Sequence, residues 1–325
     1  MDAEFLARGL LYLSLAVFGV PGNCAVISAF LLALHREGRL LPADAIVLHL
    51  ASTNLLVVGV RCVLETLATF RIANVFDDAG CKGVIFIYRT SRALSIWLTF
   101  VLSSYQCLSI APPGSRWATA RSLFAQYLWV IFLAVWVINI SISGPSAVFS
   151  VGAKNDTKLM ENSINVQFCF VSFPSAYTKD ANGAAQTVRD VVPMSLMTTA
   201  SFVILIFLYR HSRQVKGLRS GAGGGGGGGG GGASAERRAA ITVVTLVTLY
   251  VLMYGVDNGL WVYTLTVRQT LSSALLSDLR IFFSSLFAAI SPIVIIVSNK
   301  KVKKHLQCGG EEKAAAGPET TLSTA

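Results

Sequence analysis

The sequence has few charged residues: Asp, Glu, Lys and Arg together make up 14% of its 325 residues. A soluble globular chain carries about a quarter, so this composition excludes an ordinary soluble protein. Hydrophobic residues reach 53% of the chain and the mean hydropathy is +0.60. These values place the protein in a lipid bilayer.

Enzyme motifs are also missing. There is no H-x-x-x-H pair, no G-x-S-x-G nucleophile motif and no phosphate-binding loop, and the four histidines are scattered. Six cysteines are too few for a disulfide scaffold in a chain of this length. Apart from the boundary residue Lys82, the apolar runs contain no lysine that could hold retinal as a Schiff base. We therefore expect no enzyme, cofactor or metal site.

Seven apolar runs are each near the ~20 residues that span a bilayer. Because backbone groups in lipid must bond internally, such runs form helices, and we expect an all-α membrane protein with a seven-helix receptor domain over 1–298 and a tail over 299–325. The acidic start, which has no basic segment, predicts that the first run is not a cleaved signal peptide. The predicted spans are Leu10–Ala33, Ala45–Ala68, Lys82–Ile110, Leu123–Val148, Val191–Tyr209, Ala239–Val267 and Leu279–Ser298.

The net charge of +10 does not indicate nucleic-acid binding, because Lys and Arg occur in short clusters between apolar runs. Fourteen of them fall in the tail and in the segments that follow odd-numbered runs. The other connecting segments carry nine, offset by acids that include Asp180 and Asp190. The positive-inside rule then predicts an outer N-terminus and a cytoplasmic C-terminus.

The connection at about 210–238 contains ten consecutive glycines, Gly223–Gly232. Such a tract predicts a flexible coil in a loop that tolerates changes in length. Its basic flanks are expected to extend the fifth and sixth helices to where a cytoplasmic partner could dock.

Three further features lie outside the predicted spans or at their edges. Cys81 and Cys169 fall on the outer side, where a disulfide could hold the long connecting loop over the bundle; two free thiols are the alternative. Asn155 belongs to an outer N-x-S/T sequon, whereas Asn139 belongs to one inside the fourth span, out of reach of glycosylation. Cys308 follows a basic cytoplasmic segment and is a candidate S-acylation site, although those basic residues would attract anionic membrane lipids without it.

Five charged residues lie within the predicted spans: Arg61 and Glu65 in the second, Arg89 and Arg92 in the third, and Asp257 in the sixth. Charges at bilayer depth almost always turn inward, pair or face a water-filled cavity. Three arginines against two acids leave one positive charge. One interpretation is an ion-pair network that only positions helices; the other is a small-molecule site in which an anion completes the balance.

The ligand hypothesis gives each residue a role. Arg61 and Glu65 pair one turn apart, and Asp257 engages either Arg89 or Arg92. The remaining guanidinium group binds a carboxylate through two parallel hydrogen bonds. Aromatic walls are then expected from Tyr88, Tyr254 and Trp261.

Six short segments of the sequence carry a family resemblance: Gly22-Asn23, His49–Asn54, Cys81-Lys82, Tyr88–Ser95, Leu102–Pro112 and Ser291–Ile296. In these segments the sequence resembles the vomeronasal type-1 pheromone receptors and the fish olfactory receptors related to class A, within the rhodopsin-like G-protein-coupled receptor superfamily. It lacks the superfamily's Asp/Glu-Arg-Tyr, Cys-Trp-x-Pro and Asn-Pro-x-x-Tyr motifs.

This resemblance implies a chemosensory receptor in the plasma membrane of sensory neurons. It would bind a small, anionic odorant or pheromone among helices 2, 3, 5, 6 and 7 and activate a heterotrimeric G protein of the inhibitory type. Bitter-taste receptors are an alternative, but they lack the outer cysteine pair. A transporter or channel is an alternative of another class, but the seven spans show no paired repeats.

Overall fold

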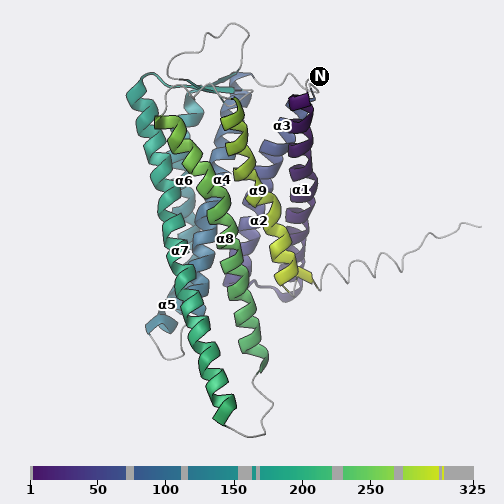
Figure 1. Cartoon of the computed structure of the whole chain (residues 1–325), viewed down its shortest axis with the longest axis vertical. Helices are drawn as coiled ribbons and strands as arrows, with labels where there is room; N and C mark the ends of the chain where they lie inside the picture. The colour runs from purple at the N-terminus through teal and green to yellow at the C-terminus, as the bar shows by residue number, and fades with distance from the viewer. Residues whose placement is uncertain are drawn as a thin grey trace, which may run out of the picture.

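The computed structural model describes residues 3–70, 77–110, 116–152, 163–165, 169–221, 230–266, 274–299 and 302–303. Most of the described residues belong to long helices that run side by side (Figure 1). The helices are α1 (Ala3–Glu37), α2 (Pro42–Val57), the π-helix η1 (Val58–Val63), α3 (Leu64–Thr69), α4 (Asp78–Ser109), α5 (Arg116–Gln126), α6 (Leu128–Val148), α7 (Ala176–Gly221), α8 (Gly230–Thr266) and α9 (Ala274–Ser298).

Seven segments of these helices are long and apolar enough to cross a membrane, as predicted. The second is a continuous rod made of α2, η1 and α3. Large apolar side chains such as Phe18, Trp129 and Phe202 are exposed on the outside of the bundle, as expected for a surface that faces lipid. The seven spans are Gly9–Glu37, Pro42–Leu67, Asp78–Ser109, Leu128–Val148, Ala176–Phe207, Ala240–Tyr263 and Leu279–Ser298.

The start of the fifth span was predicted wrongly. Helix α7 begins at Ala176 rather than at Val191, so Arg189 and Asp190 lie inside the helix and not in a connecting loop. Both side chains are buried, as is that of Gln186. Because these polar residues face the bundle interior, the helix continues without forming the apolar run on which the prediction depended.

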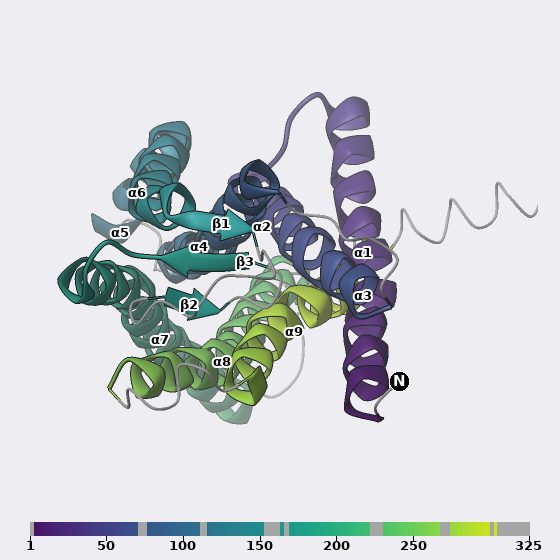
Figure 2. The same ribbon diagram turned by 90° about the horizontal axis from the view of Figure 1, so that it is seen from above.

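A small antiparallel sheet lies across one end of the bundle (Figures 1 and 2). It consists of β1 (Ser150–Gly152), β2 (Ser163–Asn165) and β3 (Cys169–Ser172), with β3 in the middle. Cys169 forms a disulfide bond with Cys81 at the start of α4, and their Cα atoms are 5.8 Å apart. The Asp78 carboxylate also accepts a 2.8 Å hydrogen bond from the backbone N–H of Gly152. The predicted disulfide is therefore present, and we call this end of the bundle the disulfide end.

At the opposite end, α7 and α8 project beyond the other helices (Figure 1). Helix α7 continues to Gly221 and α8 begins at Gly230, so both predicted extensions occur. Three glycines of the tract, Gly230 to Gly232, are helical rather than coil. Asn155 and Cys308 lie outside the described residues, so the predictions of a glycan and of acylation remain predictions.

Candidate ligand-binding site

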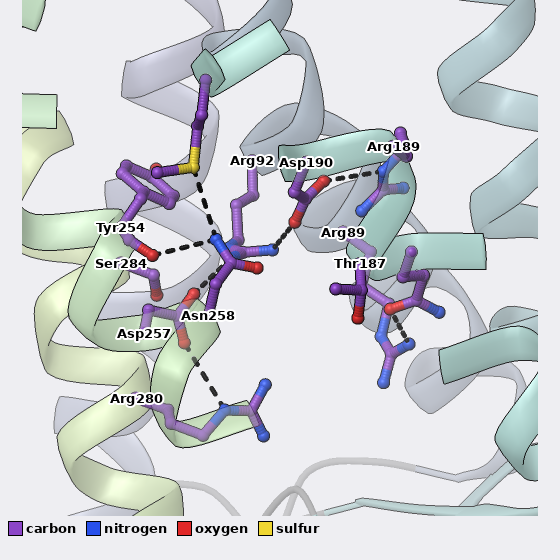
Figure 3. A network of polar contacts seen from close by, with 12 residues as sticks. Arg89, Arg92, Thr187, Arg189, Asp190, Tyr254, Asp257, Asn258, Arg280 and Ser284 are labelled. Atoms are coloured by element: carbon purple, nitrogen blue, oxygen red, sulfur yellow. Dashed lines mark hydrogen bonds and ion pairs between the residues drawn. The ribbon is translucent and has the colours of Figure 1, made fainter. Parts of the chain in front are cut away.

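The guanidinium group of Arg92 joins three helices (Figure 3). From α4, its Nη1 donates to Oδ2 of Asp190 in α7 at 2.8 Å, and its Nη2 is paired with Oδ2 of Asp257 in α8. Both carboxylates are almost completely buried. One arginine thus holds two acids from two helices, and the predicted pairing of Asp257 with a third-helix arginine occurs at Arg92.

Two further arginines extend these ion pairs. Arg189 Nε donates to the second oxygen of Asp190 at 2.9 Å, and its Nη1 donates to the Ser143 hydroxyl in α6 at 3.1 Å. Arg280 in α9 places Nε 3.5 Å from Oδ1 of Asp257 and lies over the Trp261 ring, 4.3 Å from its centroid. Positive and negative groups therefore alternate from α7 through α4 and α8 to α9.

Arg89 has a different environment, although it lies one turn before Arg92 on the same face of α4. Its Nη1 donates to the Ser146 hydroxyl at 2.7 Å and to the Gln186 side-chain oxygen at 2.8 Å. Gln186 is itself fixed by donating to Ser146 and to Asn182. Among the described residues, no carboxylate forms an ion pair with Arg89, and the groups that hold it are all neutral.

The predicted charge balance needs correction. The cluster around Arg92 contains two acids, Asp190 and Asp257, and four arginines. Two acids against four arginines leave two positive charges in the described part of the site, where the sequence predicted one. The four arginines are Arg89, Arg92, Arg189 and Arg280.

Arg61 and Glu65 pair with each other, as predicted, and so add no net charge. Arg61 Nη2 and Glu65 Oε2 are 3.5 Å apart, and both side chains are 1% exposed. The Arg61 guanidinium group also lies 5.6 Å from the centroid of the Tyr88 ring. The Tyr88 hydroxyl hydrogen-bonds to Ser284 of α9 at 2.7 Å, which links this pair to the helices around Arg280.

The predicted aromatic residues lie beside the arginines. The Tyr254 ring is 5.1 Å from the Arg92 guanidinium carbon and stacks on Tyr250 with 4.2 Å between ring centroids. Trp261 contacts Arg280 and belongs to the apolar cluster around the disulfide. Tyr254 is fully buried and Trp261 is 6% exposed, so both rings form the walls of the cluster.

Three residues of the charged site were not predicted from the sequence to belong to it. Arg189 and Asp190 stand immediately before the predicted fifth span, and Arg280 is the second residue of the predicted seventh span. A helical repeat of polar residues before Val191 was the available signal, because positions three or four apart share one helix face. The repeat runs through Lys179, Asn182, Gln186, Arg189 and Asp190.

Comparison with known proteins agrees with this architecture. The crystal structure of squid rhodopsin superposes with a TM-score of 0.72 over 98% of this chain and 89% of that chain, at 18% identity. The fold is therefore the seven-helix bundle seen in that structure. The sequence model of the vomeronasal organ pheromone receptor family matches residues 7–308, and the chain belongs to this family.

Individual relatives support the same assignment. The chain is 37% identical over 314 residues to the olfactory receptor class A-like protein 1 of Danio rerio, covering 96% of each protein. It is 25% identical over 280 residues to the human vomeronasal type-1 receptor 2, covering 86% of this chain and 69% of the relative. The protein is accordingly a chemosensory G-protein-coupled receptor and a multi-pass plasma membrane protein, not an enzyme.

Proposed function

We propose that this receptor detects a small anionic odorant or pheromone whose acidic group binds Arg89. The observation that carries the proposal is that Arg89 has only neutral partners among the described residues. We further propose that the disulfide end faces the outside of the cell, where a ligand can reach Arg89. We also propose that the receptor is expressed in chemosensory neurons.

Arg92 is a weaker candidate for direct contact, because its two terminal nitrogens already engage Asp190 and Asp257. A ligand carboxylate would have to displace one of these buried acids. Arg89 uses one terminal nitrogen for Ser146 and Gln186, and its remaining N–H groups can donate to an anion.

The competing interpretation is that the network only positions helices. A purely structural network is expected to be balanced, because a buried charge without a counter-ion costs several kcal/mol. Here two positive charges exceed the acids of the described cluster. An anionic ligand would offset that excess, which favours the binding function.

The test is a dose–response comparison of small carboxylic acids with their methyl esters in cells that express the receptor. We expect the acids to be more potent, and Arg89→Ala to weaken the response to acids by about 30-fold or more, because removing one member of a buried charged pair costs about 2–5 kcal/mol. Arg89→Lys should have a smaller effect, because it keeps the charge but loses the planar fork.

Lys82→Ala is the matched control, because it removes an exposed positive charge from the same helix. Surface expression is measured for every variant. Equal potency of acids and esters would contradict the proposal, as would an Arg89→Ala variant that loses only expression.

We also propose that the coupled G protein is of the inhibitory type and that it docks at the end where α7 and α8 project. Projecting helices at the end opposite the candidate ligand site support this location. Treating cells with pertussis toxin, which modifies inhibitory G-protein α subunits, should abolish the response. An unchanged response would identify another G-protein class.

A further inference from the structure

We infer that the ligand carries two negative charges and that Arg280 binds the second one. The inference depends on the proposed function, because it assigns a second contact to the same ligand. It names the ligand class as a small dianion: a dicarboxylate, a phosphate monoester or inorganic sulfate.

The hydrogen-bond donors of Arg280 are incompletely satisfied by the described residues of the protein. Its Nε atom is buried without a hydrogen-bond acceptor, and within the described residues none of its N–H groups donates a hydrogen bond. Its side chain is 24% exposed, compared with 13% for Arg92 and 1% for Arg189. The Trp261 ring holds the guanidinium group at 4.3 Å from its centroid, but a ring face cannot accept five hydrogen bonds.

Asp257 cannot neutralise both Arg92 and Arg280. The carboxylate of Asp257 is already paired with Arg92 through Oδ2, and Oδ1 is 3.5 Å from Arg280 Nε, which is too long for a strong hydrogen bond. One carboxylate carries one negative charge for two guanidinium groups. Asp190 likewise supplies one negative charge for two guanidinium groups, those of Arg92 and Arg189.

Arg89 and Arg280 lie on the same side of the Arg92 ion pairs. Residue 89 precedes residue 92 on a helix that starts at the disulfide end, so it is about 4.5 Å nearer that end. Arg280 lies in the first two turns of α9, and Figure 3 shows its guanidinium group beyond Asp257, on the same side as that of Arg89. The two groups with free donors therefore flank one region of the site.

The charge count selects a dianion rather than a monoanion. Two positive charges remain in the described cluster after Asp190 and Asp257 are counted. A monoanion on Arg89 would leave one buried positive charge without a counter-ion, whereas a dianion balances the site. Both guanidinium groups can donate pairs of hydrogen bonds to carboxylate or phosphate oxygens.

The experiment measures ligand-induced thermal stabilisation of the purified full-length receptor in detergent at pH 8. The matched probes are phenyl phosphate, which carries two charges at this pH, and methyl phenyl phosphate, which carries one. Sulfate serves as a dianion without an aromatic ring. We expect the titration midpoint for phenyl phosphate to be about tenfold lower than for its methyl ester.

Arg280→Gln should reduce this difference to less than about threefold by weakening the dianion alone, while Arg280→Lys should preserve most of it because it keeps the charge. Lys82→Gln, which removes an exposed charge from α4, should leave the difference unchanged. Arg89→Gln should weaken both organic probes.

The outcomes separate the two proposals. If the methyl ester binds through Arg89 as tightly as phenyl phosphate, or if Arg280→Gln keeps the tenfold difference, the dianion inference is wrong and the proposed function stands. If Arg89→Gln changes the stabilisation by none of the three probes, both are wrong. A sulfate effect that is equal in wild type and Arg280→Gln reflects general salt stabilisation and counts against the inference.

Discussion

Two of the polar networks among the described residues of the helix bundle differ in chemistry. The first lies at its centre and is neutral: Asn54 in α2 donates to the Ser291 hydroxyl at 2.9 Å and accepts from Ser95 at 2.7 Å. Nearby, the Asn23 side chain donates to the Ala288 carbonyl at 2.9 Å. These side chains are completely buried, so α1, α2, α4 and α9 are joined without any buried charge.

The second network lies nearer the disulfide end and joins α4, α7, α8 and α9 through Arg92, Asp190, Asp257 and Arg280. It fixes helices as the first does, but it also contains more positive than negative groups. The neutral network carries no charge that needs a counter-ion, although Oδ1 of Asn23 accepts no hydrogen bond. The charged network has an excess of positive charge that an anion would offset. Under the proposed function, the central network maintains the bundle and the charged network serves recognition.

The largest expected effect comes from removing a carboxylate. Asp190→Asn should lower stability by about 3–5 kcal/mol, because it leaves Arg92 and Arg189 with one counter-ion fewer in a buried site. Asp180→Asn, on the exposed face of the same helix, is the control. The measurement is the thermal unfolding midpoint of the purified receptor for each of the two variants. Equal midpoints for Asp190→Asn and Asp180→Asn would mean that the charged network is more hydrated than its burial indicates.

The disulfide should have the next largest effect. Cys81→Ala and Cys169→Ala each release β3 from α4, and the loss of a loop-closing disulfide costs about 2–5 kcal/mol. We expect low surface expression and a weak ligand response, while Cys24→Ala, which removes a free exposed cysteine, should behave as wild type. A normal response in both single variants would show that the sheet is not needed to form the charged site.

A substitution in the neutral network should lower the stability of the receptor less. Asn54→Ala removes hydrogen bonds to Ser291 and Ser95 and should cost about 1–3 kcal/mol. It should leave the preference for acids over esters unchanged, because no charge is altered. A changed preference would show that the two networks are coupled, and the division of roles would then be wrong.

The sequence predicted the seven helices because lipid-facing apolar runs are a direct signal. It predicted the Arg61–Glu65 pair because four-residue spacing is local. It did not predict Asp190 as a partner of Arg92, because Asp190 precedes the apolar run and was therefore assigned to a connecting loop. Asp257 is 165 residues from Arg92, but it lies inside an apolar run, where a charged residue is a clear signal. The strands β1 to β3 have three or four residues each, too few to show an alternating pattern.

The smallest expected effect tests which end of the bundle faces outward. We assign ligand recognition to the charged network because we place the disulfide end outside the cell. The sequon at Asn155 belongs to the segment between β1 and β2, whereas Asn139 is buried in α6 and donates to the Val135 carbonyl at 2.7 Å.

Asn155→Gln should increase gel mobility as much as glycosidase treatment does, with little change in stability. Asn139→Gln should leave mobility unchanged, since a glycan cannot reach a buried helix. If wild type and Asn155→Gln migrate alike, with and without glycosidase, the outward placement of the charged network loses its support.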